Sequence, residues 1–277
     1  MEVQILIDNN TIIDRYYLGE PGVCYLIKDG DTKILFDLGY SSTFIDNARK
    51  MGEDLLDIDY VAISHGHNDH TGGFHPLIKK YTEAREEGLP HTSPTVIAHP
   101  HAFNFKVYDD IEIGSIFSAD RIAKHFAVNL TKEPVWLTDN LVFLGQIPRE
   151  NDFESQHPVG EQHQCGCSSP DFVEDDTALA YKTPEGIVII TGCSHAGICN
   201  ITEYAKQVCN DDRIVDILGG FHLLNPDEKQ VAGTMDYFAK QDIQVMHPCH
   251  CTALKYKIEM AAIVPVEDVG VGLKLSY

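Results

Sequence analysis

An α/β fold in a single domain is the class that the sequence predicts, and three observations support it. Short strand-forming runs and tight turns fill the first 64 residues, and a helical pattern between two of the strands gives the alternation of α/β proteins. The 277 residues are 43% apolar, which is enough to bury one large core. No repeat of fixed period and no low-complexity tract divides the chain. We therefore expect one domain over residues 1–277.

The N-terminal third is expected to alternate strands with helices. The Asp29-Gly30 pair predicts a hairpin turn. The apolar spacing from Thr43 to Met51, with Gly52 just beyond, predicts a helix closed by a C-terminal glycine. A second, exposed helix is expected from Pro76 to Glu87. The strands predicted in this part are 3–7, 23–27, 33–36, 60–64 and 95–98.

The C-terminal half begins with an irregular region. Residues 149–176 are rich in Pro, Gly, Gln, His and Cys and show little apolar periodicity, so we expect a long irregular insertion, with an interdomain linker as the alternative. Regular apolar spacing then returns. The strands predicted here are 177–181, 186–191, 214–218 and 243–247, and each of the last three ends in a turn that carries histidine or cysteine.

Charge and cysteine content restrict the classes of partner. The formal net charge of −21 should repel phosphate backbones and anionic membrane surfaces, so neither nucleic acid nor a membrane is the expected partner. The sequence shows neither an N-terminal leader pattern nor an apolar run long enough to span a bilayer, which favours a cytoplasmic location. In that setting the eight cysteines are expected to be reduced thiols or metal ligands.

A dense cluster of metal-ligating side chains follows the strand predicted at 60–64. His65 and His67 are two residues apart on an extended chain, so they can point toward the same ion. Asp69 and His70 follow where Asn68 and the nearby glycines permit a tight turn toward a second ion. Imidazole nitrogen and carboxylate oxygen are ligands that zinc accepts, and without a cation this crowded set would be costly to bury.

Further ligands must come from later strand ends. His195 follows the strand at 186–191, His222 follows the strand at 214–218, and His250 follows the strand at 243–247. Loops at the same end of several strands are where α/β proteins build their sites. We predict His195 and His250 as ligands, and leave His222 open between a role in the site and a merely structural one.

These motifs carry a resemblance to a known family. The string from His65 to His70, preceded by Leu35-Phe36-Asp37-Leu38-Gly39, resembles the metallo-β-lactamase superfamily. Together with residues 191–197, 219–223 and 250–252, it is similar to the branch of methanopterin-pathway 7,8-dihydropterin-6-yl-methyl-4-(β-D-ribofuranosyl)aminobenzene 5'-phosphate synthase-like proteins. The resemblance implies an αβ/βα sandwich, in which two mixed sheets are flanked by helices and the metals lie at the open edge.

The resemblance also implies how the ligands divide. One ion would be held by His65, His67 and His195, and the other by Asp69, His70 and His250. The commoner hydrolase pattern has a bridging aspartate where this chain has Cys193. Cys193 could ligate as a thiolate, which favours zinc, or pack beneath the site as a small hydrophobe; we prefer packing or a weak contact with a ligand.

Two other features could contribute to the site. Asp37 would fix a ligand histidine, or else cap a turn. Cys165 and Cys167, with His163, could form a further metal site or a redox pair, although a reduced pair in a loop is the preferred interpretation.

The predicted function is that of a metal-dependent hydrolase. Two divalent ions, preferably Zn²⁺ with Mn²⁺ or Fe²⁺ as alternatives, would supply a metal-bound hydroxide that attacks an ester, a phosphoester or a pterin- or phosphate-type small molecule, while Asp69 or His222 moves the proton. The same site could assist the departure of phosphate, as a synthase of that branch would require.

Three other classes are weighed against this function. A flavo-diiron reductase is disfavoured because it has glutamate where His67 stands and needs a flavodoxin-like domain. A nuclease of the superfamily would be expected to have a basic face, which the composition does not indicate. A non-catalytic ligand-binding metalloprotein stays open. No motif selects the organic part of the substrate or the oligomeric state.

Overall fold

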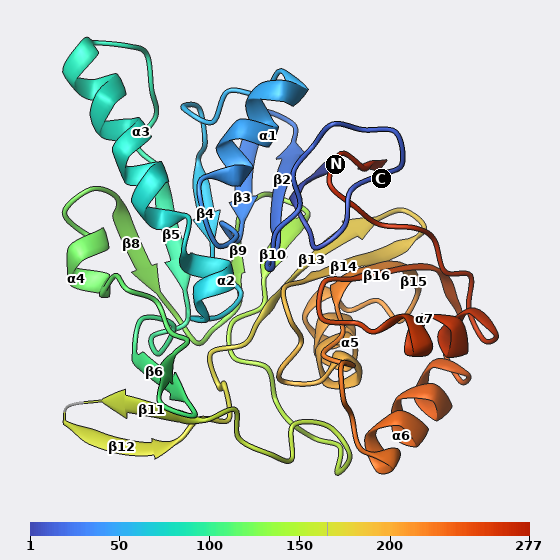
Figure 1. The fold of residues 1–277 in the computed structure, drawn as a ribbon. Helices are drawn as coiled ribbons and strands as arrows, with labels where there is room; N and C mark the ends of the chain where they lie inside the picture. The colour runs from blue at the N-terminus through green and yellow to red at the C-terminus, as the bar shows by residue number, and fades with distance from the viewer. Residues whose placement is uncertain (165) are drawn as a thin grey trace.

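Figure 1 shows the computed structural model, which describes residues 1–164 and 166–277. Its first sheet has seven strands in the order β17-β1-β2-β3-β4-β5-β8. The pairings from β17 to β3 are antiparallel, and those from β3 to β8 are parallel, so the sheet is mixed. Its strands are β1 (Glu2–Ile7), β2 (Cys24–Asp29), β3 (Thr32–Phe36), β4 (Tyr60–Ala62), β5 (Thr95–Ala98), β8 (Ala127–Leu130) and β17 (Lys274–Ser276).

The second sheet has six strands in the order β16-β15-β14-β13-β10-β9. It is also mixed, because β14, β15 and β16 run parallel whereas the remaining pairs are antiparallel. Its strands are β9 (Val135–Trp136), β10 (Leu141–Phe143), β13 (Ala178–Thr183), β14 (Gly186–Thr191), β15 (Ile214–Gly220) and β16 (Ile243–Cys249).

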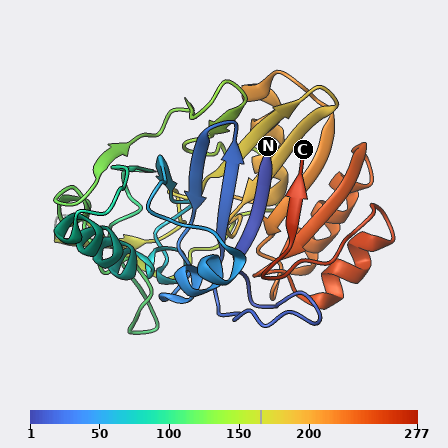
Figure 2. The same ribbon diagram turned by 90° about the horizontal axis from the view of Figure 1, so that it is seen from above.

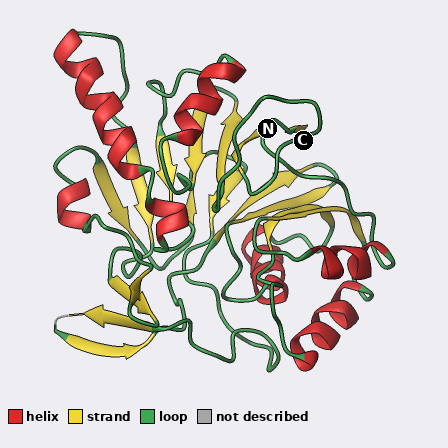
Figure 3. Cartoon of the chain, viewed as in Figure 1, coloured by secondary structure: helices red, strands yellow, loops and turns green. Residues whose placement is uncertain are grey.

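The two sheets pack face to face, and helices cover their outer faces (Figure 3). Buried side chains from both sheets, such as Phe36 and Ile190, form the central core. The first sheet is covered by α1 (Thr43–Met51), α3 (Phe74–Glu87) and α4 (Ala119–Ile122), and the second by α5 (Ile198–Cys209), α6 (Glu228–Phe238) and α7 (Leu254–Ala261). The predicted sandwich of two mixed sheets flanked by helices is therefore confirmed.

Local predictions of the N-terminal third hold well. Helix α1 has the predicted bounds, and Gly52 ends it in the left-handed conformation with φ 80°. The Asp29-Gly30 turn joins the antiparallel strands β2 and β3, as predicted. The chain termini lie side by side, and the Met1 amine donates to the Tyr277 backbone oxygen at 2.7 Å (Figure 2). Among the helices described, none combines the length and apolar character that crossing a membrane requires.

A third, four-stranded sheet differs from expectation. It contains β6 (Phe105–Tyr108), β7 (Ile111–Glu112), β11 (Glu161–Gln164) and β12 (Cys167–Pro170), in the order β12-β11-β6-β7. The region expected to be irregular thus contains a hairpin, β11–β12, whose partner β6 lies far away in the sequence. Neither strand of the hairpin buries a face, so no alternation of apolar and polar residues marks it in the sequence.

The cysteine pair considered for this hairpin can be described only in part. Cys165 lies outside the described residues. Cys167 is exposed and forms no disulfide with any of the described cysteines, and the His163 ring packs on Phe105 with the ring centroids 5.1 Å apart.

Candidate metal centre

The predicted ligands converge where the carboxyl ends of parallel strands meet. Asp37 follows β3 and His65 follows β4 in the first sheet, whereas Cys193, His222 and His250 follow β14, β15 and β16 in the second. Asp69 and His70 lie on α2 (Asn68–Thr71), a one-turn helix that takes the place of the predicted glycine turn. His67 precedes this helix in an extended conformation, with φ −70° and ψ 152°.

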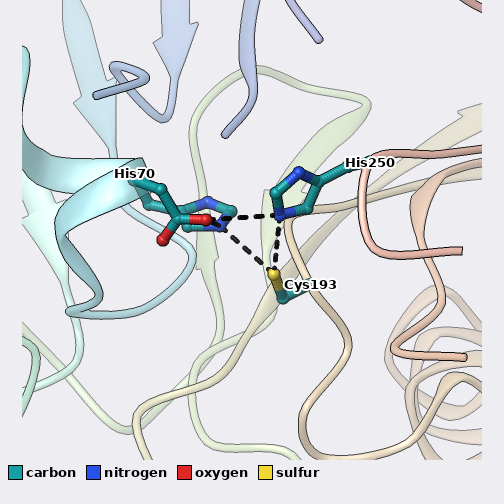
Figure 4. A group of neighbouring side chains, drawn as sticks. His70, Cys193 and His250 are labelled. Carbon is teal, nitrogen blue, oxygen red and sulfur yellow. Dashed lines mark hydrogen bonds and ion pairs between the residues drawn. The ribbon is translucent and has the colours of Figure 1, made fainter. Parts of the chain in front are cut away.

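Two groups of donors result, and the donor atoms of each group lie within 4.8 Å of one another. The three-histidine group consists of His65, His67 and His195, all buried. The mixed group consists of Asp69, His70, Cys193 and His250 (Figure 4). The structure therefore divides the residues as the family resemblance implied, and it adds Cys193 to the second group.

The three-histidine group has donor atoms without partners. The His65 Nε2 atom lies 3.0 Å from His67 Nδ1, and the His195 ring centroid lies 4.7 Å from that of His65. Among the described residues, His67 Nε2 and both ring nitrogens of His195 are buried without a hydrogen-bond partner. Burial lowers the pKa of His67 to about 3 and holds that of His195 well below its usual range. These neutral imidazoles therefore keep free lone pairs, which suits a bound cation.

The mixed group centres on the Cys193 sulfur. Cys193 Sγ lies 3.2 Å from His70 Nε2 and 3.0 Å from His250 Nε2. The Asp69 Oδ2 atom lies 3.6 Å from His70 Nε2 and 3.5 Å from His250 Nε2. Nitrogen, oxygen and sulfur donors thus face one another, a set that fits a borderline-soft divalent cation such as zinc.

Charge is distributed differently in the mixed group. Burial acts to lower the pKa of His70, but the carboxylates of Asp69 and Asp37 outweigh it and raise that pKa to about 9. Burial raises the pKa of the Cys193 thiol well above its usual range. Without a metal, a proton on His70 therefore provides the positive charge that the surrounding carboxylates favour.

Asp37 and Ser64 hold the imidazole rings of His70 and His65 from the side that faces away from the donor groups. The Asp37 Oδ2 atom accepts from His70 Nδ1 at 2.6 Å and from Ser64 Oγ at 2.7 Å. Ser64 Oγ is also 2.9 Å from His65 Nδ1. Because Nδ1 of His70 is engaged by a carboxylate, its Nε2 is left for the centre of the mixed group. Gly192 packs against this pair so closely that a Cβ atom there would collide with Ser64 Oγ.

The His250 ring is held from the N-terminal side of the chain. Its backbone N–H donates to Asp8 Oδ1 at 2.9 Å, and its Nδ1 lies 3.2 Å from Asn9 Oδ1. Asp8 and Asn9 directly follow β1, so their position after a predicted strand was the available sequence signal.

Several non-glycine residues at the centre adopt left-handed backbone conformations. These are Asp37 (φ 58°), Ser194 (φ 59°), His222 (φ 51°) and His250 (φ 48°). Each such residue costs roughly 1–3 kcal/mol, and a fold retains them where the surrounding structure imposes them, often at functional sites. Their concentration at these strand ends therefore supports a functional role for this edge of the sandwich.

A buried ion network that the sequence did not reveal supports the loop between His65 and His67. Lys106 Nζ lies 2.6 Å from Asp175 Oδ1 and 2.9 Å from Asp171 Oδ2. Asp175 Oδ2 in turn accepts from the Gly66 backbone N–H at 2.7 Å. The third sheet is thereby tied to the ligand loop. Lys106 lies outside every element and motif predicted from the sequence, so no sequence signal pointed to this role.

His222 lies beside the three-histidine group but outside both groups of donors. Its ring centroid is 4.2 Å from that of His195, and its backbone N–H donates to Cys251 Sγ at 3.3 Å. Both His222 and His195 line a cavity of about 600 Å³, which also contacts His67, Asp69 and His250. The candidate metal centre thus opens onto a space large enough for a small molecule.

The fold and this two-part donor arrangement define an α/β sandwich with a candidate metal centre, and comparison with known proteins identifies the family. The model of the metallo-β-lactamase superfamily matches residues 17–101. The chain belongs to the metallo-β-lactamase superfamily, as the motifs predicted.

Similar proteins extend this relationship over nearly the whole chain. An uncharacterized protein of Methanocaldococcus jannaschii is 32% identical over 257 residues, which cover 91% of each chain. The 7,8-dihydropterin-6-methyl-4-(beta-D-ribofuranosyl)-aminobenzene-5'-phosphate synthase of the same organism is 27% identical and covers 86% of this chain and 83% of that protein. The crystal structure of a metal-dependent hydrolase of the β-lactamase superfamily is 28% identical, covers 100% of this chain and 99% of its own, and gives a TM-score of 0.83.

Proposed function

We propose that this protein is a metal-dependent hydrolase that binds two divalent ions and cleaves an ester or phosphoester bond in a small molecule. The observation that carries the proposal is the pair of donor groups on the wall of one cavity, with buried imidazole nitrogens that lack partners among the described residues. Leaving such nitrogens unpaired is costly, and a bound cation removes the cost.

The donor chemistry suggests how the ions are held. We assign one ion to His65, His67 and His195, and the other to Asp69, His70, His250 and Cys193. We assign Cys193 as a ligand rather than as a packing residue. Its sulfur lies 3.2 Å from His70 Nε2 and 3.0 Å from His250 Nε2, so the three atoms are close enough to bind the same ion. The sulfur donor favours zinc over harder cations.

Two ions in such an arrangement would supply Lewis acidity and a nucleophile at neutral pH. The protein's own groups have complementary tasks. Asp37 fixes the ring of His70, so that only Nε2 faces the centre. His222, which lines the cavity and lies outside both groups, is assigned the transfer of a proton to the leaving group. Asp69 is the second candidate for that transfer, through the carboxylate oxygen that is not engaged as a ligand.

A second function is favoured by one specific observation, the relationship to the aminobenzene-phosphate synthase at 27% identity. In a reaction of that kind the same centre would stabilise a departing phosphate instead of directing water onto an ester. The ligands would be the same, so the metal content does not distinguish the two functions.

The test combines metal analysis with a panel of esters and phosphodiesters, assayed with and without a chelator. We expect about two zinc equivalents per chain and turnover that the chelator abolishes and added zinc restores. One equivalent, or turnover that resists the chelator, would contradict the proposal. Two equivalents with no hydrolysis in the panel would favour the synthase or a non-catalytic metalloprotein.

A further inference from the structure

The cavity that opens onto the donor groups is also lined by large, mainly apolar side chains. Tyr40, Tyr108 and Leu224 line it and remain 54%, 49% and 53% exposed. They come from three separate places in the chain, namely the loop after β3, the end of β6 and the loop after β15. Half-exposed large apolar side chains that gather around a concave site are a common mark of ligand binding. We call Tyr40, Tyr108 and Leu224 the apolar wall.

The backbone that carries Tyr40 and Tyr108 is restrained by its contacts. The Tyr40 N–H donates to Glu20 Oε1 at 3.0 Å, and the Tyr40 carbonyl approaches Gly72 so closely that a Cβ atom there would collide with it. Tyr108 is the last residue of β6, which is paired on both sides within the third sheet. The backbone at Tyr40 and Tyr108 is therefore set before a ligand arrives, which reduces the entropy lost on binding.

The cavity is poor in positive charge. A second cavity of about 580 Å³ adjoins it and shares Tyr108 and Leu224. Among the described residues, no lysine or arginine lines either cavity. The acidic side chains that do line them are Asp69 and Asp227. An anionic group placed away from the metals would find no lysine or arginine among the described lining residues and would face a protein of net charge −21.

We propose that the apolar wall binds an aryl group of the substrate, and that the substrate carries only one anionic centre, at the bond that is cleaved. The proposal rests on the proposed function for the position of the reacting bond. Aromatic rings stack on tyrosine in offset or edge-to-face geometry, and an aliphatic side chain such as Leu224 fills the remaining contact area. A substrate with a second, remote phosphate is correspondingly disfavoured.

Binding of simple phosphonates to the zinc-loaded protein tests this without any turnover. The probes are methylphosphonate, cyclohexylphosphonate, phenylphosphonate and 1,4-phenylenediphosphonate, measured by titration calorimetry. We expect phenylphosphonate to bind about tenfold more tightly than methylphosphonate and about threefold more tightly than cyclohexylphosphonate. The second phosphonate on the ring should give no gain in affinity beyond the roughly twofold statistical factor of two equivalent phosphonates.

Matched tyrosine variants locate the effect. Tyr108→Ala and Tyr40→Ala should each reduce the preference for phenyl over methyl to about threefold or less while leaving the affinity for methylphosphonate unchanged. Tyr16→Ala is the control, because Tyr16 is 93% exposed and lines neither cavity. The three side chains are all well exposed, so each variant should fold, and circular dichroism checks this.

The outcomes separate the two proposals. A phenyl preference that disappears in the Tyr108 and Tyr40 variants, in a protein that hydrolyses none of the esters, would support the apolar wall and contradict the hydrolase. Four outcomes would overturn the apolar wall. Two concern the wild-type protein: phenyl and methyl probes bind equally tightly, or no probe binds. The other two are a phenyl preference that survives in both variants and a gain from the second phosphonate beyond the statistical factor. Cyclohexylphosphonate binding as tightly as phenylphosphonate would overturn the aryl assignment.

Discussion

The three-histidine group and the mixed group lie side by side, but their buried side chains differ in protonation state and charge. The three imidazoles are neutral, because burial lowers the pKa of His67 to about 3 and those of His65 and His195 well below the usual range. In the mixed group, His70 keeps a raised pKa between two carboxylates. One group therefore offers free lone pairs, whereas the other offers negative charge that a proton now balances.

This difference predicts different modes of metal binding. The three-histidine group has no charge to attract a cation, so its affinity depends on how well the rings are oriented. The mixed group contains Asp69 and Cys193, whose anionic forms a divalent cation would stabilise directly. We expect the mixed group to bind its ion more tightly and to show a stronger dependence on pH.

The largest effect is expected for His67→Ala. It removes one of three donors from the group that lacks charge, so its ion should be lost while the mixed group keeps its own. Removing a residue that only supports a ligand typically costs 10–100-fold, and this variant removes one of only three uncharged donors, so activity should fall by more than about a hundredfold. Metal content and activity are measured together on the purified variant.

The control is His91→Ala, which removes an exposed histidine outside both groups. It should keep both ions and full activity. If His67→Ala lost both ions, the two groups would bind cooperatively. If it unfolded, the metal would be structural.

A smaller effect is expected for Asp37→Asn. The carboxylate accepts three bonds, from His70 Nδ1, Ser64 Oγ and the Ser64 backbone N–H, and an amide cannot accept all three because one oxygen is replaced by an NH₂ donor. The hold on the His70 ring is therefore weakened. We expect affinity for the mixed-group ion to fall about 10–100-fold, with the three-histidine ion less affected. Competition with a zinc-binding dye measures the two affinities separately.

Asp216→Asn is a matched control, because Asp216 is a second fully buried aspartate paired with a histidine, His247 Nδ1, at 2.8 Å. It should lower stability as Asp37→Asn does, but leave both metal affinities unchanged. Equal loss of metal in the two variants would mean that Asp37 acts only on stability.

The position of the donor groups was largely predictable from the sequence, because it depends on local strings at strand ends. The run from His65 to His70 and the later histidines each follow a predicted strand, and parallel strands bring their carboxyl ends to one edge. Helix α1 was predictable for the same local reason, since both its apolar spacing and its terminal glycine lie within a few residues.

The supporting structure was not predictable in the same way, because its contacts join distant segments. Helix α5 begins with Ile198 and Cys199, which have modest helix propensity, and Glu154 caps it by accepting from the Cys199 N–H at 3.0 Å. No local pattern marks a cap that comes from so far upstream. The Lys106 network and the pairing of β6 with β11 are hidden for the same reason.

A more moderate effect is expected for Cys193→Ser. The serine oxygen is a weaker ligand than a thiolate, but the other three donors of the mixed group remain. We therefore expect affinity for that ion to fall about tenfold, and the sulfur-to-metal charge-transfer absorption of the cobalt-substituted protein to disappear. Cys209→Ser, at another buried cysteine outside both groups, should leave both properties unchanged. Unchanged absorption in Cys193→Ser would return Cys193 to a packing role.

The smallest effect, a count of protons, tests the contrast most directly. The pKa of His70 is raised to about 9, and burial keeps Cys193 as a thiol. The His70 and Cys193 side chains of the mixed group therefore each carry a dissociable proton at pH 7 in the metal-free protein. Zinc binding to the mixed group should therefore release about two protons at pH 7, and fewer as the pH rises through about 9. The neutral three-histidine group should release none.

Calorimetric titration in buffers of different ionisation enthalpy measures this release, and His67→Ala isolates the mixed group. The raised pKa of His70 also predicts how the stability of the metal-free protein depends on pH. His70 stabilises the metal-free protein fully below pH 6.5, the ordinary pKa of histidine, and this contribution disappears as the pH rises through about 9. The melting temperature of the metal-free protein should fall over that range, but not in His70→Ala. Equal proton release by both groups would show that the electrostatic contrast between them does not govern metal binding.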